Sequence, residues 1–297
     1  MSALKALRRR AFTWFADRPV AGTLGLLAPG ALWLAVFFMV PLLMMLGYSF
    51  MERGMYGGVV YNATFEHYLR FADPLYVTIL GRTLALSMTC TLLCLLLGYP
   101  VAWTIARSGR LKNLLTFLVV LPFWTSFLVR TFAMIFLMRE SGLINAALMG
   151  LGLISEPIQL LYTPWAVLVG LVYGFLPFMI LPIYTSLEKL DPALLEAAEV
   201  LGARPTARFF RVILPLSMPG VVAGSLLVFI PSLGSYLVSD LLGGAKQMMI
   251  GNLVQNQFTS ARNWPFGSAA SFIVMGLVLI AVVAYLRTRD DEEGGLR

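Results

Sequence analysis

The stretch LDPALLEAAEVLGARPTARFFRVILPLSMPG, residues 190–220, is a polar helical segment in a chain that is otherwise strongly apolar. Its charged side chains include Glu196, Glu199, Arg204, Arg208 and Arg211. Of the 297 residues of the chain, 59% are hydrophobic and only 12% are charged, and the mean hydropathy is +0.82. Because these values lie outside the usage of soluble domains, we expect an integral membrane protein in which this stretch lies outside the lipid.

Six apolar runs are long enough to cross a bilayer as helices, which takes about 20 residues for a hydrocarbon core about 30 Å thick. They lie near residues 23–50, 76–106, 113–138, 164–187, 216–242 and 266–286. Several contain prolines, which lipid tolerates only where neighbouring helices or a cavity satisfy the freed backbone groups. The sequence therefore predicts an all-α membrane protein of six transmembrane helices that pack against protein.

Lysine and arginine are unevenly distributed between alternate loops. One side of the membrane holds more than twice as many of these residues as the other, within residues 5–18, 107–112, 189–211 and 287–297. Because cytoplasmic loops carry the excess of lysine and arginine, both termini are predicted to be cytoplasmic. The loop 190–215, called the helical knob below, is then cytoplasmic too.

Two other interpretations of the charge and of the first apolar run deserve comparison. The net charge of +7 could indicate nucleic acid, but the basic residues are scattered between apolar runs rather than gathered on one face. No nucleic-acid partner is therefore expected. A cleaved signal peptide would have a much shorter apolar region than residues 23–50, followed by a small-residue cleavage site. A retained first helix is expected instead.

The helical knob contains the signals of two short helices outside the bilayer. Asp191 is a candidate N-cap with Pro192 at the first helical position, and Gly202 can end the first helix. A second helix is expected over residues 206–213, with Pro215 closing it. The alternative is an amphipathic helix that rests on lipid headgroups. The two-helix pattern favours a compact knob of defined shape.

The sequence EAAEVLGARPTARFFRVILP, residues 196–215, resembles the EAA loop of permease subunits of ATP-binding-cassette (ABC) importers. The family pattern is Glu-Ala-Ala, three residues, Gly, nine residues, Ile, one residue, Leu-Pro. This chain meets it with Glu196, Ala197, Ala198, Gly202, Leu214 and Pro215, and has Val212 in place of the isoleucine. The resemblance implies that these residues, with Arg208, form a coupling helix that enters a groove of a separate ATPase subunit. It also implies the type I ABC importer permease fold, in a single domain over residues 1–297.

Finer stretches resemble the branch of permeases that imports the polyamines spermidine and putrescine. They include LPFWTSFLVRTFAMIFL in the third predicted span and FIPSLGSYLVSDLLGGAKQMMIGNLVQNQF around the fifth. The chain departs from this branch at Ser235, where such permeases often carry an acid. A permease for another small solute is the alternative.

The resemblance also implies the setting of the protein in the bacterial cytoplasmic (inner) membrane, as a multi-pass subunit that forms half of a translocation pathway. The implied partners are ABC ATPase subunits, a related second permease subunit and an extracytoplasmic substrate-binding protein, besides the lipid membrane. ATP and Mg²⁺ would be bound by the partner ATPase, so no cofactor is expected in this chain.

The sequence offers no motif of an enzyme. His67 is the single histidine, no G-x-S-x-G stretch is present, and LLGGAKQ lacks the spacing of a phosphate-binding loop. We therefore expect neither catalytic residues nor a metal site. A free-standing secondary transporter is a further alternative, but such a protein would need no cytoplasmic knob.

Two ionisable residues, Arg130 and Asp240, lie within predicted spans, where a charge costs about 2.5 to 3.5 kcal/mol on insertion scales. Our hypothesis is that they pair near the outer gate. The alternative is that Arg130 snorkels or bonds to the backbone carbonyls of a broken helix.

The fifth predicted span is interrupted by FIPSLGSYL, with Pro231 and Gly234. Such a break either lines a water-filled cavity, where Ser235 would also lie, or is a packing kink. Aromatic faces for a passing cation can come from Trp124, Tyr173, Phe175 and Tyr236, although aromatic residues in membrane helices also serve as packing and interface anchors.

Overall fold

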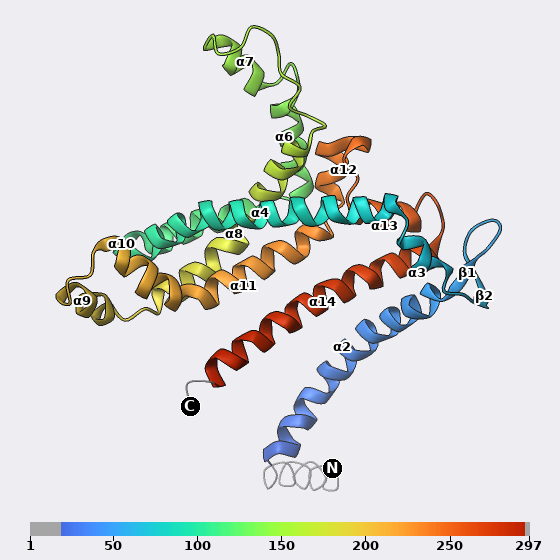
Figure 1. Cartoon of the computed structure of the whole chain (residues 1–297), viewed down its shortest axis with the longest axis horizontal. Coiled ribbons are helices and arrows are strands. Elements are labelled where there is room, and N and C mark those ends of the chain that lie inside the picture. Colours follow the sequence, from blue (N-terminus) through green and yellow to red (C-terminus); the bar gives the residue numbers. More distant parts are fainter. Residues whose placement is uncertain (1–18, 295–297) are drawn as a thin grey trace, which may run out of the picture. The chain divides into compact units, whose positions relative to one another are not determined.

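The computed structural model describes residues 19–294, and the regular structure in this range is helical apart from one small hairpin (Figure 1). Contacts divide the chain into two compact units, the first made of residues 1–68 with 262–277 and the second of residues 69–261 with 278–297. The N-terminal basic cluster and Arg297, which contribute to the predicted orientation, lie outside the described residues. The cytoplasmic position of the termini therefore stays a prediction from charge.

The first unit joins a long apolar helix to a short hairpin. Its described elements are α2 (Pro19–Ser49), β1 (Met51–Arg53), β2 (Val59–Ala63), the first part of α3 (Glu66–Phe71) and the first part of α14 (Trp264–Gly294). The strands pair antiparallel. The Ser49 hydroxyl lies 2.8 Å from the Tyr68 hydroxyl, and His67 Nε2 lies 3.0 Å from the Met51 carbonyl oxygen. The single histidine thus ties the hairpin to α3, which is a structural role.

The second unit is built around three long helices. Its elements are α4 (Pro74–Arg107), η1 (Gly109–Leu111), α5 (Lys112–Val120), η2 (Leu121–Trp124), α6 (Phe127–Met138), α7 (Leu143–Gly150), α8 (Pro164–Glu188), α9 (Pro192–Val200), α10 (Pro205–Arg208), η3 (Phe209–Ile213), α11 (Leu214–Leu233), α12 (Leu237–Gly243), η4 (Gly244–Lys246), α13 (Ile250–Phe258) and the rest of α14. The helices α4, α8 and α11 lie side by side (Figure 1).

Small residues let α8 and α11 approach closely. A Cβ added at Gly220 would lie 2.5 Å from the Pro182 carbonyl oxygen, and one added at Gly224 would lie 2.9 Å from Met179 Sδ. Met179 itself is fully buried. Membrane helices associate through such close backbone packing, because lipid tails are as apolar as the side chains they would replace.

Six described helical segments are long and apolar enough to cross a membrane, as predicted, and one of them joins α6 and α7 across a short turn. They are Leu27–Ser49, Pro74–Arg107, Phe127–Gly150, Pro164–Glu188, Pro205–Leu233 and Trp264–Val283. The internal prolines do not end these helices, since α2, α4, α8 and α11 run through them. Neighbouring helices in the second unit supply the packing that this requires.

Two of the predicted spans have wrong bounds. The third, 113–138, is not one helix, because the backbone is extended at Thr125 between η2 and α6. The Thr125 hydroxyl and N–H both donate to the Pro122 carbonyl, at 2.8 and 3.2 Å, which closes η2 there. The fifth, 216–242, ends early, because α11 stops at Leu233 with Gly234 as its C-cap and α12 is a separate helix.

The contact between α8 and α11 generates a stability test. Replacing Gly220 by Ala should destabilise the protein by about 2 kcal/mol, because the added methyl group has no room against the Pro182 carbonyl. The measurement is the thermal unfolding of the purified protein in detergent. Gly81→Ala is the matched control, since a Cβ there meets nothing within 4 Å and alanine favours a helix by up to about 1 kcal/mol. Equal unfolding temperatures for the two variants would contradict the tight contact.

Candidate functional site: the helical knob and the pathway positions

The first half of the helical knob forms as its sequence predicts. The Asp191 carboxylate accepts a hydrogen bond of 2.9 Å from the Ala193 N–H, and Pro192 begins α9. After α9, Gly202 has a φ of +77°. Its N–H donates to the Glu199 carbonyl at 2.9 Å, and the N–H of Ala203 donates to the carbonyl of Ala198 at 3.0 Å. These two bonds form a Schellman motif, which fixes the direction in which the chain leaves α9.

The second half of the knob differs from the prediction. Only residues 205–208 form an α-helix, and residues 209–213 form a π-helical turn that leads directly into α11. Pro215 does not close a helix there. It lies in the first turn of α11, where a missing N–H costs little. The knob is therefore continuous with α11. At its other end, α8 stops at Glu188, three residues before Asp191, the N-cap of α9.

A salt bridge holds the two halves of the knob together. Arg208 Nη1 lies 2.8 Å from Glu199 Oε2. Arg208 is mostly covered, whereas Glu199 is largely exposed. This pair joins α10 to α9 across the turn at Gly202, and so gives Arg208 a role within the knob.

The surface of the knob is open to a partner. Val200 and Leu201 are 87% and 86% exposed, and Phe210 is also exposed. Glu196 and Ala197 of the EAA sequence are exposed beside them on α9, and Ala198 is partly covered. Adjacent exposed apolar side chains with a carboxylate among them are typical of a protein interaction site.

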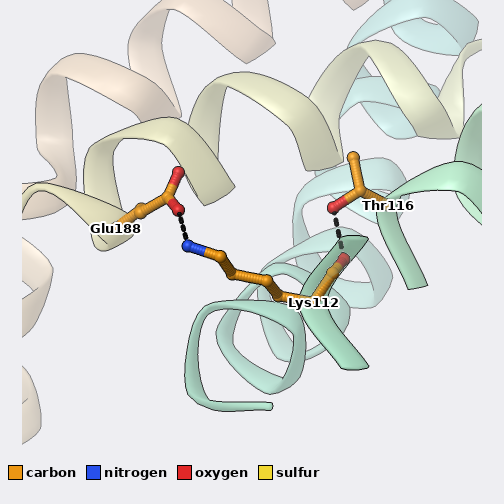
Figure 2. A network of polar contacts seen from close by, with 3 residues as sticks. All are labelled: Lys112, Thr116 and Glu188. Carbon is orange, nitrogen blue, oxygen red and sulfur yellow. Dashed lines mark hydrogen bonds and ion pairs between the residues drawn. The ribbon is translucent and has the colours of Figure 1, made fainter. Parts of the chain in front are cut away.

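Lys112 and Glu188 join the start of α5 to the end of α8, next to the knob. Lys112 Nζ lies 2.7 Å from Glu188 Oε1, and the Thr116 hydroxyl donates to the Lys112 carbonyl at 2.8 Å (Figure 2). The hydrogen bond to the glutamate raises the pKa of Lys112 above its usual value. Sequence reasoning missed this pair, because residues 76 positions apart give no local signal.

The hypothesis that Arg130 pairs with Asp240 is wrong for this structure. The ion pairs found in the second unit include Lys112 with Glu188 and Arg208 with Glu199, but none joins Arg130 to Asp240. Arg130 Nε and Nη1 are buried and have no hydrogen-bond partner, which also disagrees with bonding to the carbonyls of a broken helix. Asp240 is exposed on α12.

Aromatic rings surround the Arg130 guanidinium instead. Its central carbon lies 5.6 Å from the ring centre of Phe123, 5.5 Å from that of Phe127 and 5.7 Å from that of Tyr173. Tyr173 is thus the one aromatic residue of the predicted pathway whose ring lies beside the Arg130 guanidinium in the described structure. Phe175 lies next to Phe127, with ring centres 6.4 Å apart, whereas Trp124 stacks edge-on against Phe117.

Side chains from α13 and α4 support the break after α11. The Asn252 amide donates to the Tyr236 carbonyl at 3.0 Å, and the Ile250 N–H donates to the Thr83 hydroxyl at 2.9 Å. The break lies after Gly234, at Ser235 and Tyr236, while Pro231 is inside α11. The first bond joins α13 to the N-cap of α12, whose carbonyl also accepts from the Asp240 N–H at 2.8 Å, and the second joins the first N–H of α13 to α4. Asn252 and Thr83 were missed by sequence reasoning, because neither lies near the break in the chain.

Within residues 19–294, no group of three or more His, Cys, Asp and Glu side chains is placed to hold a metal ion. The six candidate spans, the exposed knob and the irregular backbone after α11 are features of a multi-pass membrane protein with an exposed loop suited to protein contact. Comparison with known proteins identifies the class.

Residues 94–289 match the family described as the inner membrane component of binding-protein-dependent transport systems, and the chain belongs to this family. It is therefore a multi-pass transport component of the inner membrane rather than an enzyme. A chain of a bacterial ABC transporter involved in the import of the acidic polysaccharide alginate has the same fold, with a TM-score of 0.72, 18% sequence identity and coverage of 94% of this chain and 98% of that chain. The predicted type I permease fold is confirmed.

Closer relatives in sequence are spermidine/putrescine transport system permease proteins named PotB. The chain is 47% identical over 252 residues to PotB of Salmonella typhimurium strain LT2, which covers 84% of this chain and 88% of the relative. It is 46% identical over 252 residues to PotB of Escherichia coli K12, which covers 84% of this chain and 92% of the relative.

The turn at Gly202 generates a test of local stability. Gly202→Ala forces a side chain into the left-handed region, which costs roughly 1 to 2 kcal/mol. We expect amide hydrogen exchange of α9 to become about tenfold faster, measured by mass spectrometry on the purified protein. Gly109→Ala is the control, because Gly109 has a φ of +50° in another loop and bears the same strain. Faster exchange of α9 in the control would contradict a local role of Gly202.

The Lys112–Glu188 pair generates a prediction on pH. Because its pKa is raised, Lys112 stays protonated in the folded protein up to and above the usual lysine value of 10.5. The stabilisation is complete below that value and is lost only as the pH rises through the raised pKa. The difference in unfolding temperature between the wild type and Lys112→Met should thus be equal at about pH 6 and about pH 9. A difference that shrinks within this range would mean that another group controls the contact.

Proposed function

We propose that the chain is a permease subunit of an ATP-driven importer of polyamines, spermidine and putrescine, and forms half of its translocation pathway. The observation that carries this proposal is the identity of 46–47% over 84% of the chain to permeases named for spermidine and putrescine transport. The fold alone does not carry it, since the alginate transporter shares the fold with a chemically different cargo.

The helical knob would couple this subunit to an ABC ATPase. The coupling residues are Glu196, Ala197, Ala198, Gly202, Arg208, Leu214 and Pro215. The exposed apolar surface at Val200 and Leu201 supports this role, because it can fill a groove of a partner. ATP and Mg²⁺ would be bound by that ATPase, whose closure would move the knob.

The structure suggests how such movement would reach the membrane. The first helix of the knob, α9, begins at Pro192, shortly after α8 ends at Glu188, and the knob is continuous with α11. The helices α8 and α11 pack tightly at Gly220 and Gly224. A displacement of the knob would therefore move α8 and α11 together rather than bend the chain between them. Rigid displacement of packed elements is a common way to switch the access of a pathway.

The remaining partners complete the importer. A second permease subunit, related to this chain, would form the other half of the pathway, and an extracytoplasmic binding protein would deliver the cargo. The polyamine is a flexible cation, so exposed aromatic faces such as those of Tyr173 and Tyr236 are suited to it. The pathway positions would also include Trp124, Arg130, Phe175, Pro231, Gly234, Ser235 and Asp240.

Uptake of labelled spermidine and putrescine tests the proposal. In cells that lack the gene, uptake should fall and should return when the gene is supplied. In cells supplied with the Glu196→Ala gene, uptake should be at least about tenfold lower than in cells supplied with the wild-type gene, because the coupling between ATP hydrolysis and transport is lost. Glu156→Ala is the control, since Glu156 is exposed in a loop far from the knob in sequence and should not change uptake.

Three outcomes decide between the candidate functions. Unchanged polyamine uptake in the deletion strain would show that the importer carries another small solute. Full uptake with Glu196→Ala would favour a transporter that works without an ATPase. Loss of uptake with Glu156→Ala would mean that the assay reports general damage rather than coupling.

A further inference from the structure

The helical knob joins α11 through the π-helical turn η3. The N–H of Leu214 donates to the carbonyl of Phe209, five residues back, where an α-helix would use the carbonyl of Phe210. Pro215 has no N–H group, so it cannot give the carbonyl of Arg211 an α-helical hydrogen bond. Single π-helical turns inside helices are rare, occur mostly at functional sites and are among the few places where helices kink. The knob and α11 can therefore bend relative to one another at η3.

Tyr99 of α4 contacts this helix on both sides of the π-helical turn. Its ring meets that of Phe209, the first residue of the turn, edge to face, with centres 5.5 Å apart and planes at 80°. Its hydroxyl lies 2.8 Å from the hydroxyl of Ser217, in the first turn of α11. Because the Ser217 hydroxyl donates to the Leu214 carbonyl at 3.0 Å, its oxygen accepts from Tyr99. One side chain thus bridges the turn.

The bridge lies inside the protein. Tyr99 is only 8% exposed, and Ser217 is fully buried. A phenylalanine ring would fill nearly the same space at position 99, so packing alone does not require a hydroxyl there. A hydrogen bond between two membrane helices depends on direction as well as distance, and therefore fixes their relative position more closely than apolar contact does.

The two ends of the bridge lead to the knob surface and to the rest of the bundle. Phe209 packs edge-on against Phe210, with ring centres 5.0 Å apart, and Phe210 is 65% exposed on the knob. On α4, beside Tyr99, a Cβ added at Gly98 would lie 3.2 Å from Met179 Cγ of α8. Packed side chains therefore connect the surface of the knob with α4 and α8 as well as with α11.

We propose that Tyr99 is a positioning residue of the transport cycle, which bridges the π-helical turn so that the knob and α11 move as one body with α4. The inference rests on the proposed function, in which an ATPase displaces the knob. Without the bridge, the knob would turn at η3, and part of each displacement would be lost before it reached the membrane helices. ATP would then be hydrolysed without movement of cargo.

The ratio of ATP hydrolysed to spermidine taken up tests this role. The chain is reconstituted in proteoliposomes with the other subunits of the importer, namely the second permease, the ATPase and the binding protein. Tyr99→Phe keeps the ring and removes the hydroxyl, and it should raise the ratio at least about threefold. Ser217→Ala removes the same hydrogen bond from the other side, so it should act similarly, and the double variant should be no worse than either single variant.

Thr91→Val is the matched control. Thr91 is also buried on α4, but its hydroxyl donates to the Ser87 carbonyl of the same helix at 2.8 Å. This variant removes a buried hydroxyl without touching the bridge, so its ratio should equal that of the wild type. A residue with a purely structural role would lower ATP hydrolysis and uptake together and leave the ratio unchanged.

Amide hydrogen exchange, measured by mass spectrometry on the same complexes without polyamine, tests the stiffness of the turn directly. Peptides that cover residues 205–213 should exchange at least about threefold faster in Tyr99→Phe than in the wild type, and at the wild-type rate in Thr91→Val. Equal exchange in the wild type and Tyr99→Phe would overturn the bridge.

The outcomes separate this inference from the proposed function. If the wild-type complex takes up no spermidine, the proposed cargo is wrong, and hydrogen exchange alone then decides whether Tyr99 bridges the turn. If the wild type takes up spermidine and Tyr99→Phe leaves the ratio unchanged, the importer stands and the coupling role of Tyr99 is wrong. Should Tyr99→Phe fail to assemble with its partners, the ratio measured for Ser217→Ala gives the answer.

Discussion

The close packing of α8 against α11 is the constraint on which the second unit depends. Where Gly220 faces the Pro182 carbonyl, the two backbones approach too closely for any side chain between them. In lipid this contact does not arise from the hydrophobic effect, so it needs complementary shapes. The same two helices lead into the helical knob from either side. Their contact therefore fixes the packing of the bundle and also the distance between the two chain ends from which the knob projects.

Around this bundle, polar groups are placed where the chain can satisfy them. The Tyr99 hydroxyl lies 2.8 Å from the Ser217 hydroxyl, which joins α4 to α11 inside the core. The Thr83 hydroxyl accepts from the first N–H of α13, and the Asn252 amide donates to the Tyr236 carbonyl next to the break after α11. Arg130 is the exception, because aromatic rings lie around its guanidinium and its buried Nε and Nη1 atoms have no hydrogen-bond partner.

Much of the fold follows from local sequence signals. The number of spans follows from length and apolar composition, because a helix must bond its own backbone in order to cross lipid. The first half of the knob follows from an N-cap aspartate and a glycine that adopts a positive φ, both of which act within a few residues. The bounds of the third and fifth spans were wrong, since a proline does not reveal whether its neighbours can support a continuous helix.

The sequence by itself determined the class of this protein, its six spans and the position of its knob, because each depends on composition or on contacts within one helical turn. Only the tertiary structure decided the partners of its charged groups. Arg130 faces aromatic rings from η2, α6 and α8 rather than Asp240, and Lys112 meets Glu188 across 76 positions of sequence. Such contacts depend on the directions in which packed helices leave their turns, and no spacing along the chain encodes that direction.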